Sequence, residues 1–263
     1  MMRMIDETAV ANQKLWEAEV QNGCGYTIPW LNLNVTLLRR FANGELAALP
    51  EPLDCISPPS IFSDIVGKDV LCLAAGGGQQ TAVFGLLGAN VTVVDLTAGQ
   101  LQGDKQAAVH YGYPVTCVQA DMRDLSALAD SSFDLVFQAD SLSYVPDVRQ
   151  VYREVARVLR PNGLYRIKHY QPVAHAVEAD EHGYYIERPY AQKIYHREDG
   201  GVEFRHYMDD IFGGLIETGL QLQQVIDVGR NITPDPQAAP RSWAHQDAYV
   251  GGGFIIIAVK RDA

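Results

Sequence analysis

Residues 69–81 read DVLCLAAGGGQQT, and residues 93–96 read VVDL. This pattern predicts an apolar strand, a glycine loop, a helix and a second apolar strand that ends at Asp95. Glycines let the backbone approach a ligand closely, and the start of a helix offers unpaired N–H groups. A carboxylate at the end of the second strand can accept hydrogen bonds from both hydroxyls of a ribose. Together these features predict a pocket for an adenosine-containing cofactor.

The glycine spacing bears on which adenosine cofactor this is. The dinucleotide fingerprint G-x-G-x-x-G would have a third glycine where this chain has Thr81, although Gly76 and Gly78 have the right interval. Three consecutive glycines bring the backbone close to a ligand without completing a pyrophosphate cradle. An NAD-type oxidoreductase is therefore an alternative that the loop disfavours.

The same loop resembles motif I of the class I S-adenosylmethionine (SAM)-dependent methyltransferases, V-L-D-L-G-C-G-x-G. The matching residues are Val70, Leu71, Leu73, Gly76 and Gly78. Cys72 stands where the family usually has an acid that organises the loop, and Ala74 replaces the first glycine. We expect Ala74 to be tolerated because a methyl group fits the extended conformation. The two departures leave open a second alternative, a non-catalytic protein of the same fold that binds or scaffolds a partner.

Further landmarks follow in the order typical of this family, and they resemble its small-molecule branch, methyltransferase type 11. Strands are predicted at residues 89–94, 115–118, 133–137 and 164–170. Apolar residues at positions 148, 151, 152, 155, 158 and 159 form a helical stripe. Pro161 ends this helix and Gly163 makes the turn into the last of these strands. The resemblance is strong over residues 65–170.

The resemblance implies an α/β fold, a Rossmann-like doubly wound sheet of seven strands in the order 3-2-1-4-5-7-6 with strand seven antiparallel. Strands six and seven are expected at residues 220–228 and 253–260, after a helix over 207–218 that stops at Gly219. Residues 1–60 are expected to form a helical extension that caps the cofactor, with helices near 9–20 and 32–40. Residues 61–263 then form the SAM-binding domain, in which 171–206 is a substrate-side insertion with one or two strands within 184–195.

The family also suggests which residues bind SAM and its product S-adenosylhomocysteine. Ala74, Gly76 and Gly78 are expected near the methionine portion, and Asp95 at the ribose hydroxyls. The remaining residues expected at the cofactor are Leu96 against adenine, Asp121 at the adenine amino group with Met122 beside it, and Gln138 near the sulfonium or amino-acid end. Tyr26 and Trp30 are candidates for a wall of the pocket, or else pin the extension to the core.

Methyl transfer from a sulfonium mainly requires alignment of an acceptor lone pair with the methyl group. An oxygen acceptor usually also needs a base. His169 is the first candidate, because it ends strand five at the sheet edge where open α/β sheets bind ligands. Tyr144 and Asp140, after strand four, are the other catalytic candidates. For each of the three, a satisfied residue at the rim of the site is the competing interpretation.

Composition narrows the partners and the location. The 263 residues carry a net charge of −11 without a run of Lys or Arg, which argues against nucleic acid and anionic membrane surfaces as partners. The four cysteines form no C-x-x-C, so no metal site is predicted. Acids near the N-terminus replace the apolar core of a signal peptide, and no run could span a bilayer, so the expected location is cytoplasmic. The expected partner is a small-molecule methyl acceptor of unknown identity, and the oligomeric state is left open, a homodimer included.

Overall fold

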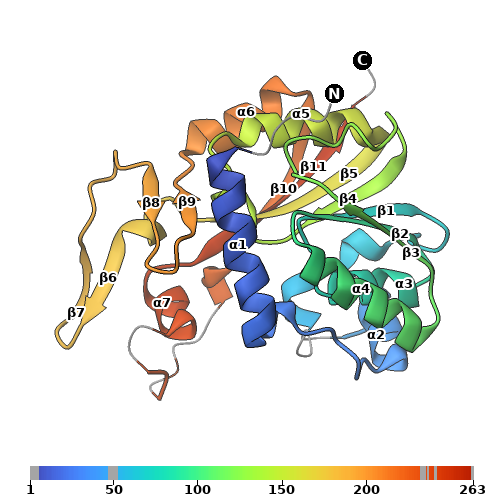
Figure 1. Ribbon diagram of the computed structural model, residues 1–263, viewed down its shortest axis with the longest axis horizontal. Helices are drawn as coiled ribbons and strands as arrows, with labels where there is room; N and C mark the ends of the chain where they lie inside the picture. The colour runs from blue at the N-terminus through green and yellow to red at the C-terminus, as the bar shows by residue number, and fades with distance from the viewer. Residues whose placement is uncertain (1–5, 47–52, 232–234, 236, 240–241, 262–263) are drawn as a thin grey trace.

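A seven-stranded sheet runs through the centre of the protein in the computed structural model (Figure 1), which describes residues 6–46, 53–231, 235, 237–239 and 242–261. The strand order is β3-β2-β1-β4-β5-β11-β10. Strand β11 is antiparallel to both of its neighbours, and the other pairs are parallel. This confirms the expected order and the antiparallel seventh strand. The strands are β1 (Asp69–Leu73), β2 (Asn90–Asp95), β3 (Val115–Gln119), β4 (Phe133–Gln138), β5 (Leu159–Tyr170), β10 (Leu220–Asp227) and β11 (Gly253–Lys260).

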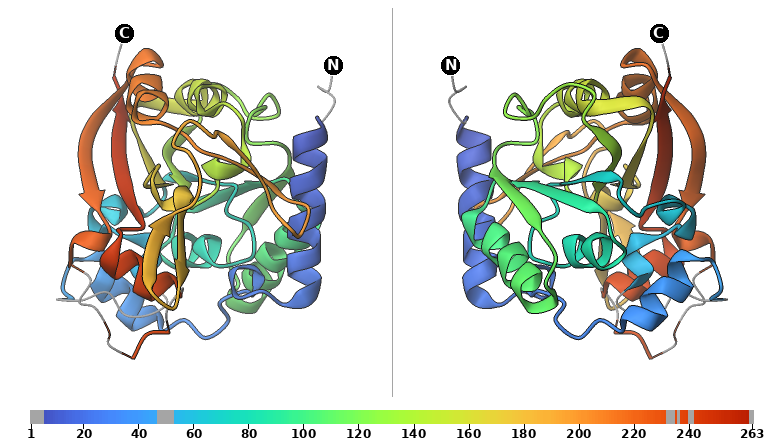
Figure 2. Two further views of the ribbon diagram at one scale, coloured as in Figure 1. Left: turned by 90° about the vertical axis from the view of Figure 1, so that its left-hand side faces the viewer. Right: turned by 90° about the vertical axis from the view of Figure 1, so that its right-hand side faces the viewer.

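Helices cover both faces of this sheet, as Figures 1 and 2 show. Side chains of α5 (Val148–Val158) and α6 (Gly214–Glu217) pack in one core cluster with Leu71 and Leu73. Side chains of α2 (Val35–Ala42), α3 (Gln80–Leu86) and α4 (Ala98–Tyr111) pack in the other with Val70 and Cys72. Successive β1 side chains point to opposite faces, so the apolar run from Val70 to Leu73 supplies both clusters.

Two elements differ from their expected form. Strand β5 begins at Leu159 rather than at residue 164, because Leu159 already pairs with Phe133 of β4. The register then shifts so that Leu135 pairs with Leu164, and residues 160–163 bulge between the two pairs. The helix expected over 207–218 is a π-helical turn (Asp209–Gly213) followed by α6, and Gly219 ends it with a φ of +78° as predicted.

The described part of the N-terminal extension contains two α-helices, α1 (Glu7–Asn22) and α2, close to their expected positions. The Asp6 side chain accepts a hydrogen bond from the Ala9 amide and so caps the start of α1. Gly23 ends α1 in the left-handed conformation. Helix α1 runs across the molecule beside α4 (Figures 1 and 2). Residues 1–5 and 47–52 of the expected extension lie outside the described residues.

The insertion after β5 is built of two hairpins, and one strand of each overlaps the expected range 184–195, which confirms that this range contains two strands. The hairpins are β6–β7 (Val177–Asp180 and Gly183–Ile186) and β8–β9 (Ile194–His196 and Val202–Phe204). The β6–β7 hairpin extends away from the sheet in Figure 1. The Tyr184 hydroxyl lies 2.6 Å from Nδ1 of His245, which joins this hairpin to α7 (Trp243–Tyr249).

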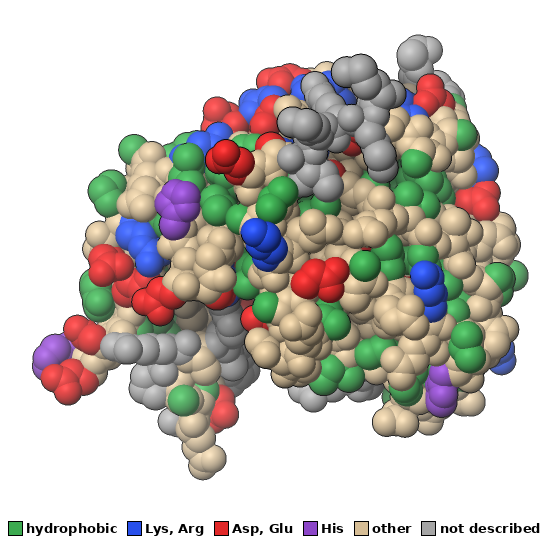
Figure 3. Space-filling view, viewed as in Figure 1, with side chains coloured by type: hydrophobic (Ala, Val, Ile, Leu, Met, Phe, Trp, Pro, Cys, Tyr) green, Lys and Arg blue, Asp and Glu red, His purple; other side chains and the backbone are tan. Residues whose placement is uncertain are grey.

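Two further features concern the charged surface of the protein and the polarity of its helices. Acidic and basic side chains are interspersed over the face shown in Figure 3. Within the described ranges, every helix is too short or too polar to cross a lipid bilayer.

Candidate active site

The glycine loop lies at the edge where the carboxyl ends of β1, β4 and β5 come together. Leu73 pairs with Gln138, which in turn pairs with Ile167. Ala74 begins the loop with a φ of +45°, so the expectation of an extended Ala74 was wrong. The chain turns sharply here, and the Ala74 amide donates to the Val94 carbonyl of the neighbouring strand at 2.8 Å. A left-handed alanine costs about 1–2 kcal/mol, which explains why a glycine is usual at this position.

The loop is enclosed so tightly that side chains have no room. A Cβ atom placed on Gly76 would lie 2.9 Å from Oδ2 of Asp95. One placed on Gly78 would lie 2.4 Å from the Gly103 carbonyl oxygen of α4. Gly78 also has a φ of +75°, which L-residues rarely adopt. The glycines therefore allow close packing of the loop against β2 and α4.

Asp95 ends β2 beside this loop, as the sequence predicts. Its Oδ2 accepts a hydrogen bond from the Gly76 amide at 3.0 Å, and its Oδ1 accepts one from the Thr97 amide at 2.9 Å. Burial raises the pKa of the Asp95 carboxyl, while the two amides act in the opposite direction. A carboxylate has about four lone-pair positions, so Asp95 can accept a further hydrogen bond.

A second buried carboxylate, Asp104 of α4, supports the loop from behind, and sequence reasoning missed it. Its Oδ2 accepts a hydrogen bond from the Gly77 amide (3.2 Å), and its Oδ1 accepts from the Gly78 amide (2.9 Å) and the Thr81 hydroxyl (2.6 Å). Asp104 is close enough to Cys72 that, after burial, it is the second cause of the raised pKa of that thiol. Asp104 thus provides from α4 the loop-organising carboxylate that is absent at Cys72. One feature of the sequence could have indicated this role: Asp104 is an acidic residue on the same face of α4 as the small or apolar residues Leu101, Ala107 and Ala108.

Asp104 predicts a specific pH dependence of stability. Burial raises its pKa from 3.8 to about 7, so the folded protein holds a proton that the unfolded chain has released. Its stabilising contribution is therefore complete below pH 4 and is lost as the pH rises to about 7, by up to a few kcal/mol. Urea unfolding at pH 4.5, 6 and 8 gives the free energy of unfolding of Asp104→Asn and of wild type. As the pH rises, we expect the free energy of unfolding of wild type to fall relative to that of the variant. Asp64→Asn, at an exposed aspartate, is the control. If the difference in free energy of unfolding between Asp104→Asn and wild type were the same at all three pH values, the raised pKa of Asp104 would be contradicted.

The structure places the other predicted cofactor residues along the same edge. Asp121 is bound by the Arg123 guanidinium, with a shortest distance of 2.6 Å, and Arg123 also pairs with Asp6 at 2.7 Å. Nε2 of Gln138 lies 2.9 Å from the Ser141 hydroxyl and 3.3 Å from Sδ of Met122. The Gln138 side chain is fully buried and therefore fixed in orientation.

Helix α1 contacts this edge at several points. Gln13 donates to the Leu96 carbonyl at 2.9 Å, and Glu17 accepts from the Gly99 amide at 3.3 Å. Tyr26 is 67% exposed, and its carbonyl oxygen lies beside Gly77. Trp30 packs against the core cluster to which α2, α3 and α4 contribute, which agrees with the interpretation that it pins the extension to the core.

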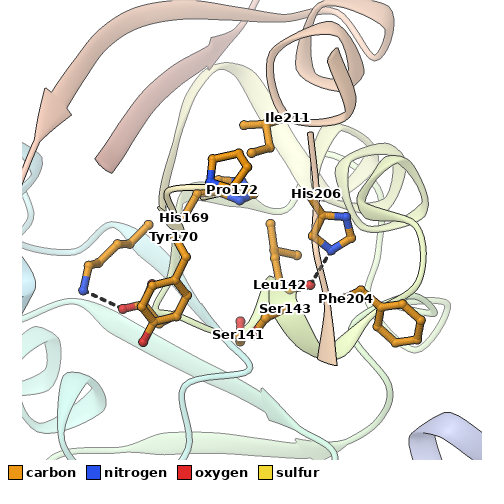
Figure 4. A pocket seen from close by; sticks show the side chains of 11 residues that line it. Ser141, Leu142, Ser143, His169, Tyr170, Pro172, Phe204, His206 and Ile211 are labelled. Carbon is orange, nitrogen blue, oxygen red and sulfur yellow. Dashed lines mark hydrogen bonds and ion pairs between the residues drawn. The ribbon is translucent and has the colours of Figure 1, made fainter. Parts of the chain in front are cut away.

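A small pocket opens at the carboxyl ends of β4 and β5 (Figure 4). Its lining includes two of the three catalytic candidates, His169 and Asp140. The third, Tyr144, is outside the lining, because its ring packs edge-on against Trp16 of α1 at 5.6 Å. The insertion contributes Pro172, Phe204 and His206 to the lining. The pattern of hydrophobic residues in the sequence does not show which residues of the insertion reach the pocket.

Both candidates in the lining already have polar partners. Oδ2 of Asp140 lies 2.6 Å from Nζ of Lys168, and its Oδ1 is buried without a hydrogen bond from the described residues. Nε2 of His169 lies 2.8 Å from the hydroxyl of Tyr152 on α5. Burial, with a smaller effect from His206, lowers the pKa of His169 to about 3, so its imidazole is neutral at physiological pH.

Comparison with known proteins agrees with this geometry. The family described as "Methyltransferase domain" matches residues 71–167. The chain is 30% identical over 222 residues to "Uncharacterized methyltransferase YbaJ" of Bacillus subtilis (strain 168), spanning 79% of this chain and 86% of the relative. The chain belongs to the class I SAM-dependent methyltransferases. It is accordingly an enzyme that uses SAM, rather than an NAD-type oxidoreductase or a scaffold.

Two further comparisons match proteins whose names state a reaction. "Ubiquinone biosynthesis O-methyltransferase" of Chromobacterium violaceum is 32% identical over 118 residues, which cover 43% of this chain and 51%, about half, of the relative. A solved structure of the Burkholderia thailandensis 1,6-didemethyltoxoflavin-N1-methyltransferase, with 1,6-didemethyltoxoflavin and S-adenosylhomocysteine bound, matches with a TM-score of 0.60. It is 18% identical, and the match covers 97% of this chain and 90% of that one, so it demonstrates a shared fold.

The residues of the methyltransferase fit SAM. The glycine loop leaves no room for side chains, and the buried Oε1 of Gln100, beside Gly77, makes no hydrogen bond with the described residues. This oxygen and the free lone pairs of Asp95 suit the hydroxyl and ammonium donors of SAM. When bound, SAM supplies an electrophilic methyl group on a sulfonium. The carboxyl group of Asp95 favours such a cationic ligand over a pyrophosphate.

Proposed function

We propose that this methyltransferase transfers the methyl group of SAM to an oxygen or nitrogen of a small molecule bound in the pocket at the ends of β4 and β5. The observation that carries the proposal is that the glycine loop and the pocket are adjacent. The ends of β1, β4 and β5 are consecutive in the sheet, so the glycine loop and the pocket share one edge. A cofactor on the loop and an acceptor in the pocket would therefore be neighbours, which alignment of the methyl group requires.

The cofactor roles expected from the sequence become part of this proposal. Ala74, Gly76 and Gly78 would pass the methionine portion, and Asp95 would accept from the ribose hydroxyls. Leu96, Asp121 and Met122 would form the adenine end, where Asp121 is held in place by Arg123. Gln138 would lie near the sulfonium or amino-acid end, because it ends β4 beside the end of β1, which leads into the glycine loop.

The extension and the insertion would enclose the two ligands. We propose that residues 1–60 cap the cofactor, supported by the contacts of α1 with Leu96 and Gly99 and by the ion pair of Asp6 with Arg123. Residues 171–206 would form the acceptor side, supported by Pro172, Phe204 and His206 in the pocket lining. Enclosure excludes water from the reacting groups.

His169, Asp140 and Tyr144 are proposed to act on the acceptor side. His169 and Asp140 line the pocket, whereas Tyr144 would support the wall through its contact with α1. The named reactions of the two matched proteins, one at oxygen and one at nitrogen, support an acceptor of either kind.

A screen of small hydroxyl- and amine-bearing molecules, read out as S-adenosylhomocysteine formed, tests the proposal. Ser143→Phe would place a bulky ring in the pocket, away from the glycine loop. We expect it to abolish turnover of any acceptor found while S-adenosylhomocysteine affinity stays within about threefold of wild type. Ser126→Phe, at an exposed serine outside the pocket, should leave both unchanged. Full turnover by a folded Ser143→Phe variant would place the acceptor elsewhere.

A further inference from the structure

The pairing of Tyr152 with His169 determines which nitrogen of this histidine carries the proton. Tyr152 is fully buried on α5, and its hydroxyl has Nε2 of His169 as its one hydrogen-bond partner among the described residues. His169 is 4% exposed and stacks on the ring of Phe254 at 5.9 Å. Both rings are therefore fixed by packing, and the hydrogen bond between them is not shared with water.

The direction of this bond follows from the cost of an unsatisfied donor. If Nε2 carried the proton, the Tyr152 hydroxyl hydrogen would be buried without an acceptor, at about 1–3 kcal/mol. If Tyr152 donates to Nε2, both groups are satisfied. The neutral imidazole has one N–H, which then resides on Nδ1.

Nδ1 is the polar atom of His169 that remains for a ligand. It makes no hydrogen bond within the described part of the chain, and it is not among the buried polar atoms that lack a partner. The ring itself lines the pocket, as Figure 4 shows. Nδ1 is thus open to the pocket, where it presents a hydrogen to an acceptor.

We propose that His169 is a hydrogen-bond donor to the methyl acceptor rather than its base, and that Tyr152 is the positioning residue that sets this role. The proposal rests on the proposed function, since it assumes that the acceptor occupies this pocket. It replaces the role of general base expected for His169 from the sequence. A base would need a free lone pair toward the acceptor, and the lone pair of His169 points to Tyr152.

The donor role indicates the class of acceptor. The charged and titratable groups around His169 are Tyr152 from α5, His206 after β9, Lys168 and Tyr170 on β5, and Asp140 after β4. Asp140 is already paired with the Lys168 ammonium. This ion pair adds no net charge to the pocket, so the hydrogen on Nδ1 of His169 decides which oxygen suits this position. It suits a molecule that binds as an oxyanion: a phenol or enol acidic enough to ionise.

The reaction balances without a protein base. The acceptor hydroxyl releases its proton to water, and the oxyanion accepts the hydrogen bond from Nδ1. An oxygen lone pair then forms the bond to the methyl carbon, while the carbon–sulfur pair returns to sulfur and gives S-adenosylhomocysteine. The Nδ1 proton stays on His169 throughout.

The tautomer can be tested on the ligand-free protein. Nitrogen–proton NMR correlation of 15N-histidine-labelled wild type, with His169 assigned by its absence in His169→Asn, should show the Nδ1–H tautomer unchanged from pH 5 to 8. Tyr152→Phe should shift the proton toward Nε2. Tyr165→Phe is the matched control, because that buried tyrosine bonds Gln138 instead and should leave the tautomer unchanged. An Nε2–H tautomer in wild type would overturn the proposal.

Once an acceptor is found, two substitutions separate a donor from a base. Asparagine offers an N–H near the position of Nδ1 but cannot act as a base. We expect His169→Asn to keep activity within about tenfold of wild type and His169→Leu to lose about a hundredfold. Equal loss in both folded variants would favour the base instead. If no acceptor turns over, the proposed function fails while the NMR result still decides the tautomer.

Discussion

Replacing Gly78 by alanine is expected to destabilise the protein by about 3 kcal/mol or more. Two effects add at this position. The left-handed φ of +75° costs alanine about 1–2 kcal/mol. The new Cβ would also lie 2.4 Å from the Gly103 carbonyl oxygen, which belongs to helix backbone and cannot move aside without displacing α4 from the loop.

Gly112 is a matched control for this prediction. It has the same φ of +75°, but a Cβ placed on it would meet nothing within 4 Å. Gly112→Ala should therefore show the conformational cost alone, about 1–2 kcal/mol in a urea unfolding experiment. Equal costs for the two variants would mean that the loop is not enclosed as described.

The second large effect is expected at Asp95. Asp95→Ala should weaken SAM and S-adenosylhomocysteine binding more than tenfold, because hydrogen bonds to a charged group contribute about 1.5–3 kcal/mol each. The Gly76 and Thr97 amides would also lose their acceptor, so some stability should be lost as well. Asp95→Asn retains an oxygen for one of these two amides and places its NH2 group against the other, so part of the stability should again be lost. It should unfold at lower free energy than wild type but higher than Asp95→Ala, and still bind at least tenfold more weakly.

Asp69→Asn provides the control for Asp95. Asp69 lies at the amino end of β1, on the opposite edge of the same sheet, where it pairs with Arg160 at 2.7 Å. Isothermal titration should give the same affinity for S-adenosylhomocysteine in the Asp69→Asn variant as in wild type. Wild-type affinity in a folded Asp95→Asn protein would remove Asp95 from the ribose site.

The sequence predicted those parts of the fold that depend on local patterns. The order of apolar strands, the glycine loop and the acid at Asp95 each follow from a short stretch of residues, and the structure places them at one sheet edge as expected. Gly219 likewise ends its helix as predicted, because its role depends only on its own backbone conformation.

Tertiary contacts explain what the sequence could not show. Asp104 acts on the loop from α4, and the substitution at Cys72 alone gives no sign that another carboxylate compensates for it. The conformation of Ala74 depends on the turn that the Val94 carbonyl imposes. For His169, strand position predicted its place in the pocket, but the partner that takes its lone pair, Tyr152, is on another element.

The most direct measurement is isothermal titration of the wild-type protein with SAM, S-adenosylhomocysteine and NAD in parallel. The glycine loop with Asp95 and Asp104 predicts micromolar binding of the first two ligands and no heat with NAD. Binding of NAD, or no binding of either adenosyl-sulfur ligand by the folded protein, would contradict the account of this site.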